Sequence, residues 1–341
     1  MALKNYIVEE VALDCADGLL TRREALRRLG LMGLTGAAAA TLLAACGDDD
    51  EEAATTSGAA TTTGAATTQP VSAAPITSSP PAAATTQAVP SSAPGGASTS
   101  PTPTTAAPAV PAAPPTGEEI RFNGPNGELI GVVAEAASPS GAVLVIHENR
   151  GLTEHIRSIP PRLAADGYTA LAIDLLSEEG GTAGMPSEGD ATAALGNAPT
   201  DRMIADLRAG LDELARRAPG AKLAVIGFCF GGGMTWQLVA AGETRLDAAV
   251  PFYGPFPSGS DLSGSPNAAV LGIYAGEDSR VNGSMDDAEQ ALTAAGLTHE
   301  LRVFEGVDHA FFNDTGQRYD ADAAAEAYQA MLDWFGEHLA A

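Results

Sequence analysis

From about residue 117 to the end of the chain, continuous apolar runs alternate with segments whose apolar residues recur at helical spacing. The apolar runs predict buried strands at 142–147, 168–174, 223–228, 248–253, 269–274 and 300–304. The helical spacing predicts helices at 156–166, 200–217, 234–241, 285–295 and 321–339. Buried parallel strands that alternate with amphipathic helices form a doubly wound sheet. The sequence therefore predicts an α/β fold with a mostly parallel sheet and helices on both faces.

Two further stretches refine this pattern. Residues 120–122 and 129–134 flank a Pro-Asn-Gly turn at 125–127, which predicts a β-hairpin ahead of the parallel strands. Residues 177–197 contain many Gly and Ser residues and are expected to form a loop. The folded region of roughly 225 residues suits a single domain.

Small residues surround the cysteine at the end of the apolar run 223–228. Gly227 precedes Cys229 by two residues, and three glycines at 231–233 follow it before the helical pattern begins. Strand, tight turn and helix in this order are typical of a nucleophile elbow, here with cysteine where serine is commoner. Glycines are needed because larger neighbours would collide, and the following helix N-terminus favours a thiolate. A buried structural cysteine is the alternative.

A thiol nucleophile needs a base, and the base needs a group that orients it. His309 and Asp278 each stand just past a predicted strand, where sites form in doubly wound sheets. Cys229, Asp278 and His309 follow the order nucleophile, acid, histidine, which is that of the α/β-hydrolase fold. Glu277 and Asp308 are close alternatives for the acid.

The N-terminal region carries export signals rather than a folding pattern. Residues 1–20 are mildly acidic, with no clear element that could be buried. Arg22 and Arg23 then precede an uncharged, weakly apolar run at 29–45 that ends at Cys46. Residues 1–46 thus resemble a twin-arginine export signal with a lipobox, in which the cysteine is lipidated. A signal cut by an ordinary peptidase and a short uncleaved anchor are the alternatives. We expect an extracytoplasmic protein that is lipid-anchored to the cell membrane.

Composition separates this region from the folded domain. Residues 47–117 are mostly Ala, Thr, Pro and Ser, and they predict a disordered tether because they have too little apolar surface to bury. The net charge of −25, with no basic patch, argues against nucleic-acid binding. The three cysteines Cys15, Cys46 and Cys229 are far apart and make a disulfide framework improbable. We expect no metal and no cofactor.

Residues 118–341 resemble the dienelactone hydrolase (carboxymethylenebutenolidase) family of cysteine-nucleophile α/β-hydrolases. The matching motifs are Gly-Phe-Cys-Phe-Gly-Gly at 227–232, Gly-Glu-Asp-Ser-Arg-Val at 276–281, Asp-His-Ala-Phe at 308–311 and Ile-His-Glu-Asn-Arg-Gly-Leu at 146–152. The resemblance implies an ester or lactone hydrolase in which Cys229, His309 and Asp278 act through a thioester acyl-enzyme. A non-catalytic surface-anchored binding protein on the same fold and a hydrolase of another acyl bond are the alternatives.

The resemblance also implies a role for Glu148, which in the family contacts the cysteine and helps control when the thiol becomes a thiolate. A nearby carboxylate destabilises a thiolate or accepts its proton. The alternatives are a solvated loop acid and a partner for Arg150 or Arg157.

The remaining site residues are predicted from the same motifs. The backbone amide of Phe230 and a second amide near Asn149 are expected to form the oxyanion hole. Arg150, Tyr253 and Phe311 are candidates for contact with a small ester or lactone substrate.

Family members that act on dienelactone hold its carboxylate with arginines, one of them four residues past the histidine. This chain has Asn313 there, a further substrate-binding candidate, and Arg318 could substitute for the arginine. A broader esterase or lactonase is therefore expected.

Overall fold

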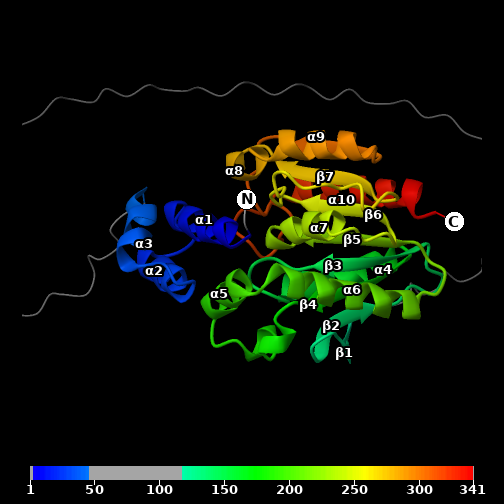
Figure 1. Ribbon diagram of the computed structural model, residues 1–341, viewed down its shortest axis with the longest axis horizontal. Helices are drawn as coiled ribbons and strands as arrows, with labels where there is room; N and C mark the ends of the chain where they lie inside the picture. The colour runs from blue at the N-terminus through cyan, green and yellow to red at the C-terminus, as the bar shows by residue number, and fades with distance from the viewer. Residues whose placement is uncertain (1–2, 46–116, 341) are drawn as a thin grey trace, which may run out of the picture. The chain divides into compact units, whose positions relative to one another are not determined.

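The computed structural model of the chain describes residues 3–45 and 117–340. Within them an eight-stranded sheet runs in the order β1-β2-β4-β3-β5-β6-β7-β8. The hairpin of β1 (Glu118–Asn123) and β2 (Glu128–Ala134) is antiparallel, and β2 is also antiparallel to β4. All other neighbouring strands are parallel (Figure 1). The predicted hairpin and the mostly parallel sheet are confirmed.

The other strands and the helices that follow them lie close to their predicted positions. The strands are β3 (Gly141–Ile146), β4 (Tyr168–Asp174), β5 (Leu223–Phe228), β6 (Leu246–Phe252), β7 (Ala269–Ala275) and β8 (His299–Phe304). The helices are α4 (Glu154–Ala165), α6 (Thr200–Arg217), α7 (Phe230–Ala240), α8 (Ser279–Asn282), α9 (Met285–Ala295) and α10 (Ala321–His338). Every residue of β3, β4 and β5 is buried, because helices cover both faces of these strands.

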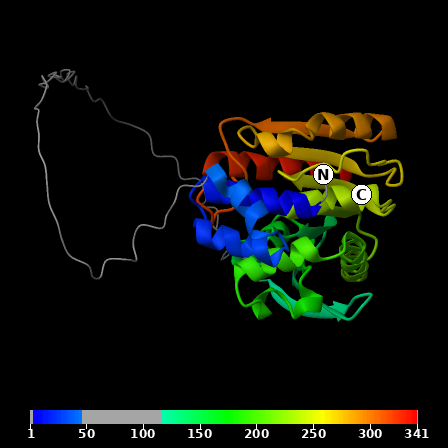
Figure 2. The same cartoon turned by 60° about the vertical axis from the view of Figure 1, so that its left-hand side comes forward.

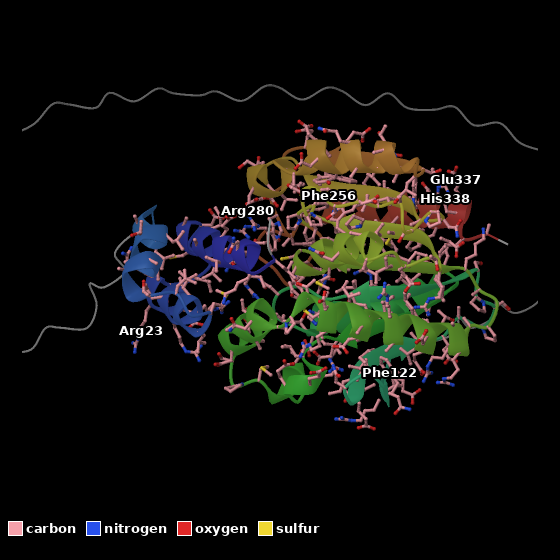
Figure 3. The ribbon with its side chains drawn as sticks, in the orientation of Figure 1. Arg23, Phe122, Phe256, Arg280, Glu337 and His338 are labelled. Carbon is pink, nitrogen blue, oxygen red and sulfur yellow. The ribbon has the colours of Figure 1, made fainter. Side chains whose placement is uncertain are left out.

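Two helix layers enclose the sheet. Helices α6 and α7 lie against one face, and α4 and α10 lie against the other (Figure 1). Arg162 of α4 stacks over the ring of Tyr328 of α10 at 5.1 Å, which holds these two helices side by side. Phe256, labelled in Figure 3, is fully buried and packs edge-on against Trp236 of α7.

The expectation of a loop at 177–197 is wrong for about half of that segment. Two 3-10 turns, η2 (Ser177–Glu179) and η3 (Thr182–Gly184), precede a helix, α5 (Glu188–Asn197). Ser187 caps α5 by accepting a hydrogen bond from the amide of Asp190. Helix α5 packs against the N-terminal helices (Figure 2), so long-range contacts override its weak helical pattern.

The expectation that residues 1–20 form no buried element is also wrong. They contain α1 (Leu3–Ala16), which buries Leu3, Tyr6, Ile7, Glu10, Val11, Asp14 and Cys15. Helix α2 (Arg22–Leu31), helix α3 (Gly36–Leu42) and the turn η1 (Leu43–Ala45) follow. Acidic residues share the buried face of α1, and this mixture hid the helix from a search for apolar periodicity.

Two findings bear on the predicted export segment. In the part of the chain that the structure describes, no helix is both long enough and apolar enough to span a membrane. Cys15 is disulfide-bonded, against the expectation from the spacing of the cysteines, whereas Cys229 is free. Cys46 and the predicted tether, except for residue 117, lie outside the described residues.

The turn from β5 into α7 is tight and backbone-crowded. Cys229 adopts φ 58° and ψ −117°, a strained conformation for a residue with a side chain. A Cβ on Gly227 would lie 2.1 Å from the carbonyl oxygen of Gly231, and a Cβ on Gly231 would lie 2.4 Å from that of Ile146. Glycine at both positions is what lets β5, α7 and β3 approach each other.

We therefore expect Gly227→Ala to destabilise the fold by about 3 kcal/mol or more, because its contact is with backbone that cannot move aside. Gly184→Ala is the matched control, since no atom lies within 4 Å of a Cβ added there. Urea unfolding followed by circular dichroism measures both. A loss below about 1 kcal/mol for Gly227→Ala would contradict the close approach.

Candidate active site

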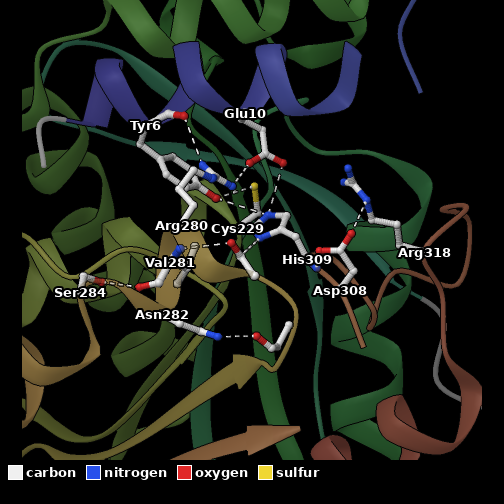
Figure 4. Close-up of polar contacts among 12 residues, drawn as sticks. Tyr6, Glu10, Cys229, Arg280, Val281, Asn282, Ser284, Asp308, His309 and Arg318 are labelled. Atoms are coloured by element: carbon white, nitrogen blue, oxygen red, sulfur yellow. Dashed lines mark hydrogen bonds and ion pairs between the residues drawn. The ribbon is translucent and has the colours of Figure 1, made fainter. Parts of the chain in front are cut away.

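The predicted nucleophile, acid and histidine meet at the carboxyl edge of the sheet. Cys229 follows β5, Asp278 follows β7, and His309 lies in the loop after β8. His309 Nδ1 is 2.5 Å from Asp278 Oδ2, and the amide of Val281 donates to Asp278 Oδ1 (Figure 4). All three side chains are buried. The geometry selects Asp278 over its neighbour Glu277 as the partner of the imidazole.

Asp308, the other alternative acid, has different partners. Its Oδ1 accepts the amide of His309, and its Oδ2 is 3.2 Å from Arg318 Nε. It fixes the backbone of the histidine loop rather than the imidazole ring.

Burial and neighbouring charges shift the pKa values of these three side chains in opposite directions. Burial disfavours a charged imidazole, but Glu10, Cys229 and Asp278 outweigh burial and raise the pKa of His309 well above its ordinary value. Burial, together with the charge of Glu10, raises the pKa of the Cys229 thiol, although His309 opposes the shift. Burial also acts on Asp278, yet His309 and Arg280 hold the pKa of its carboxyl below the ordinary value.

Glu148 lies in the loop after β3, beside the same cluster. Its Oε2 accepts a hydrogen bond of 2.7 Å from Asn313 Nδ2, and its Oε1 is buried with no hydrogen-bond partner among the described residues. Burial raises the pKa of this carboxyl. Asn313, which stands where the family's arginine is expected, thus contacts the glutamate, so the alternative of a solvated loop acid does not fit this geometry.

Two histidines that the sequence did not single out hold the surrounding loops. His147 Nδ1 lies 2.6 Å from the carbonyl oxygen of Glu148, and its Nε2 lies 3.1 Å from the amide nitrogen of Leu175. Burial lowers the pKa of His147, which favours the neutral ring that this pairing requires. His155 Nδ1 is 2.7 Å from Asp314 Oδ1. A histidine at the end of a buried strand was the available signal for His147.

A cavity of about 180 Å³ opens beside the cysteine. Its walls include Cys229, His309, Asn149, Arg150 and Asn313, so most of the predicted site residues share one space. Phe230 is the first residue of α7, where a backbone amide has no acceptor within the helix.

Tyr253 and Phe311 have another position. Both are fully buried, and the Tyr253 ring packs edge-on against the imidazole of His309 at 5.0 Å and against Phe311 at 5.6 Å. They support the histidine from behind and are not among the residues of the cavity wall.

Helix α1 brings two residues into the site that no pattern in the sequence predicts. The Tyr6 hydroxyl is 3.3 Å from Cys229 Sγ and 3.3 Å from His309 Nε2. Glu10 Oε1 is 3.4 Å from the same imidazole nitrogen, and the other carboxylate oxygen of Glu10 pairs with Arg280 (Figure 4). No local pattern links residues more than 200 positions apart.

The same cluster contains the potential metal ligands of the described residues. Glu10, Cys229 and His309 each offer one ligand atom within 4.8 Å of the others, and all are buried. The guanidinium of Arg280 already compensates the charge of Glu10, so a cation would compete with a fixed cation of this chain.

Comparison with known proteins shows similarity to hydrolases. The sequence model of the dienelactone hydrolase family matches residues 129–339. A "putative carboxymethylenebutenolidase" of Escherichia coli strain K12 is 34% identical over 219 residues, which cover 60% of this chain and 79% of that protein. A protein of Saccharolobus solfataricus with the same description is 28% identical over 248 residues, which cover 63% of this chain and 96% of that protein.

A solved structure agrees with both relatives. The crystal structure of a "putative dienelactone hydrolase" from Klebsiella pneumoniae subsp. pneumoniae has a TM-score of 0.58 and 30% identity, and the match covers 64% of this chain and 98% of that chain. The chain therefore belongs to the dienelactone hydrolase family and is a carboxylic ester hydrolase.

Proposed function

We propose that the protein hydrolyses an ester or lactone through Cys229, His309 and Asp278, with a thioester acyl-enzyme as intermediate. The observation that carries this proposal is the Asp278–His309 hydrogen bond of 2.5 Å, together with a ring nitrogen of His309 that lies within 4.8 Å of the Cys229 sulfur. The acid thus orients the imidazole, and the imidazole lies beside the sulfur, which is the arrangement that acyl transfer to a thiol nucleophile requires.

The proposed reaction has two halves. The thiol proton of Cys229 passes to His309 Nε2, and the sulfur attacks the carbonyl carbon. Backbone amides of Phe230 and Asn149 stabilise the oxyanion, and the imidazolium returns its proton to the leaving alkoxide. A water molecule then attacks the thioester while His309 takes its proton, and collapse of the second tetrahedral intermediate releases the acid and the thiol.

Glu148 regulates the nucleophile in this proposal. Burial raises the pKa of the Cys229 thiol, and the charge of Glu148 adds to this shift, so both disfavour a thiolate. Because Asn313 holds one carboxylate oxygen and the other has no partner, the carboxylate is free to respond when a substrate enters. The thiol would then stay protonated, and poorly reactive, until the cavity is filled.

The substrate class is broader than dienelactone. Asn313 carries no positive charge, and its side-chain amide donates to Glu148. It therefore cannot bind a substrate carboxylate as the family's arginine does. Arg150 and Arg318 line the cavity and supply positive charge elsewhere on its wall. We therefore favour esters and lactones in general.

Substitution of the three central residues tests the proposal. Cys229→Ala and His309→Ala should each lower kcat/KM by about a thousandfold or more, and Asp278→Asn by about a hundredfold or more, because they act as one unit. The assay compares nitrophenyl esters, small lactones and dienelactone. His299→Ala is the control, since His299 lies at the start of β8, at the end of the strand opposite the site, and pairs with Glu289 of α9. Wild-type rates for Cys229→Ala or His309→Ala would disprove the site.

The proposed role of Glu148 predicts a change in pH dependence. Glu148→Gln removes a charge that raises the pKa of Cys229, so the thiolate should form at lower pH. The rate of Cys229 alkylation by iodoacetamide, followed against pH by peptide mass spectrometry, should show a midpoint shifted downward. Glu305→Gln, on an exposed turn, is a control for the change of net charge. A midpoint that stays constant or rises would contradict this role.

We also propose that residues 1–46 direct twin-arginine export and that Cys46 is lipidated in the mature protein. The paired Arg22 and Arg23 ahead of an uncharged run, and the small residues before Cys46, support this proposal. Mass spectrometry of the mature N-terminus should find a diacylglyceryl group on Cys46. An unmodified N-terminus elsewhere would contradict lipidation.

A further inference from the structure

We propose that α1 is an internal inhibitor whose Tyr6 and Glu10 occupy the reacting position of the site, and that the enzyme turns over only when α1 is displaced. The inference rests on the proposed function of Cys229 and His309. It starts from one contact: the Tyr6 hydroxyl is 3.3 Å from the sulfur and 3.3 Å from the imidazole Nε2 (Figure 4).

That position is where the substrate must react. The carbonyl carbon has to approach the sulfur, and the leaving oxygen has to come within hydrogen-bond distance of His309 Nε2. The Tyr6 hydroxyl lies within reach of both the sulfur and Nε2, which is the position that a substrate oxygen would take. The ring behind it is fully buried, with the guanidinium of Arg280 4.3 Å from its centroid. An ester group and the Tyr6 side chain cannot occupy this volume together.

Charged contacts fix α1 in this place. Tyr6, Glu10 and Asp14 are four residues apart, so they lie on one helix face. Glu10 pairs with Arg280, whose Nη1 also donates to the backbone carbonyl of Tyr6. Figure 4 shows the guanidinium of Arg280 beside Tyr6 and Glu10 of α1.

Asp14 continues this face towards the mouth of the cavity. It is 3.1 Å from Arg318 and 4.0 Å from Arg150, both of which line the cavity, and Asp17 also pairs with Arg318. The acids of α1 thus occupy the arginines that face an incoming substrate.

The composition of the buried face argues against a merely structural helix. Glu10 is 4% exposed and Asp14 is 6% exposed, whereas a helix that only covers a core normally presents apolar residues. Buried ion pairs add little net stability, so their presence is better explained by matching to a particular site. Burial, followed by the charge of Glu10, raises the pKa of the Cys229 thiol, which favours the less reactive protonated form of the covered nucleophile.

Displacement of α1 is feasible. The helix has 14 residues, and isolated helices of this length are marginal in water, so its structure depends on docking. With α1 in place the remaining cavity is about 180 Å³, below the usual range for ligand pockets of roughly 300–1,000 Å³. Cys15, near the C-terminal end of α1, is disulfide-bonded, so Tyr6 and Glu10, which precede it, would leave the site while the disulfide holds that end of the helix.

The test uses the full chain and a readout that does not depend on hydrolysis. Glu10→Lys places a cation against Arg280 and should expel α1, whereas Glu9→Lys makes the same charge change outside the buried face of the helix. We expect iodoacetamide to alkylate Cys229 about tenfold faster or more in Glu10→Lys than in the wild type, at a pH where burial and Glu10 keep the covered thiol protonated. Peptide mapping assigns the alkylation to Cys229, and Glu9→Lys should match the wild type within about twofold.

Tyr6→Ala supplies a second, uncharged variant. It should also expose the thiol, and it should raise kcat/KM on nitrophenyl esters together with the alkylation rate. Thermal unfolding shows whether each variant keeps the catalytic domain folded. Equal alkylation rates in the wild type, folded Glu10→Lys and folded Tyr6→Ala would overturn the inference. So would faster alkylation combined with a lower kcat/KM, because α1 would then complete the site rather than block it.

Failure of the proposed function gives a different result. If no variant hydrolyses any ester or lactone while Glu10→Lys and Tyr6→Ala still accelerate alkylation, α1 covers the thiol as inferred and the substrate class is wrong. If the open variants hydrolyse esters no faster than the wild type and alkylate no faster, the site is an esterase that α1 does not inhibit.

Discussion

The charge on the buried imidazole of His309 is the interaction on which the site depends. Taking an imidazolium out of water is costly unless carboxylates surround it. Asp278 supplies one at Nδ1, and with α1 docked Glu10 supplies a second at Nε2. Burial lowers the pKa of the ring, but the two carboxylates outweigh burial and favour the imidazolium, which cannot accept a proton. Withdrawal of α1 leaves one, so the pKa of His309 moves back towards the range in which it can act as a base. Steric and electrostatic effects of α1 therefore act in the same direction.

The parallel sheet is what brings that imidazole to the sulfur. Strands β5, β6, β7 and β8 are consecutive neighbours, so the loops that follow them open at the same edge. The amide of Cys229 donates to the carbonyl of Phe252 at the end of β6, which fixes the height of the elbow relative to that edge. From the loops after β7 and β8, Asp278 then reaches His309 through a hydrogen bond of 2.5 Å, and a ring nitrogen of His309 lies within 4.8 Å of the sulfur. A shift of register in any of these strands would separate the three residues.

This dependence explains which parts could be predicted from the sequence. Cys229, Asp278 and His309 each follow a continuous apolar run, and the ends of such runs share one edge in a parallel sheet, so their proximity followed from local patterns. The contact between Asn313 and Glu148 spans 165 positions and has no such pattern. Tyr253 and Phe311 read as pocket residues, but their rings lie behind His309, and alternation along a strand or loop does not reveal that side. Tyr6 was beyond reach for the same reason, since its partner Cys229 is 223 positions away.

The N-terminal helix has to satisfy two requirements that pull against each other. It must dock specifically and yet come away, and its residues divide these tasks. Leu3 lies close to Gly233 of α7 and Ile7 close to Gly196 of α5, where apolar contact supplies attraction without direction. Glu10 and Asp14 meet Arg280 and Arg318, where the cost of desolvation offsets most of the Coulomb gain but a misplaced helix would leave charges unpaired. Buried ion pairs of this kind therefore select one docked position of α1 but add little to the strength of its binding. A helix anchored only by large apolar residues would bind the same surface more firmly, with less control over where Tyr6 points, and would be harder to remove from the site it covers.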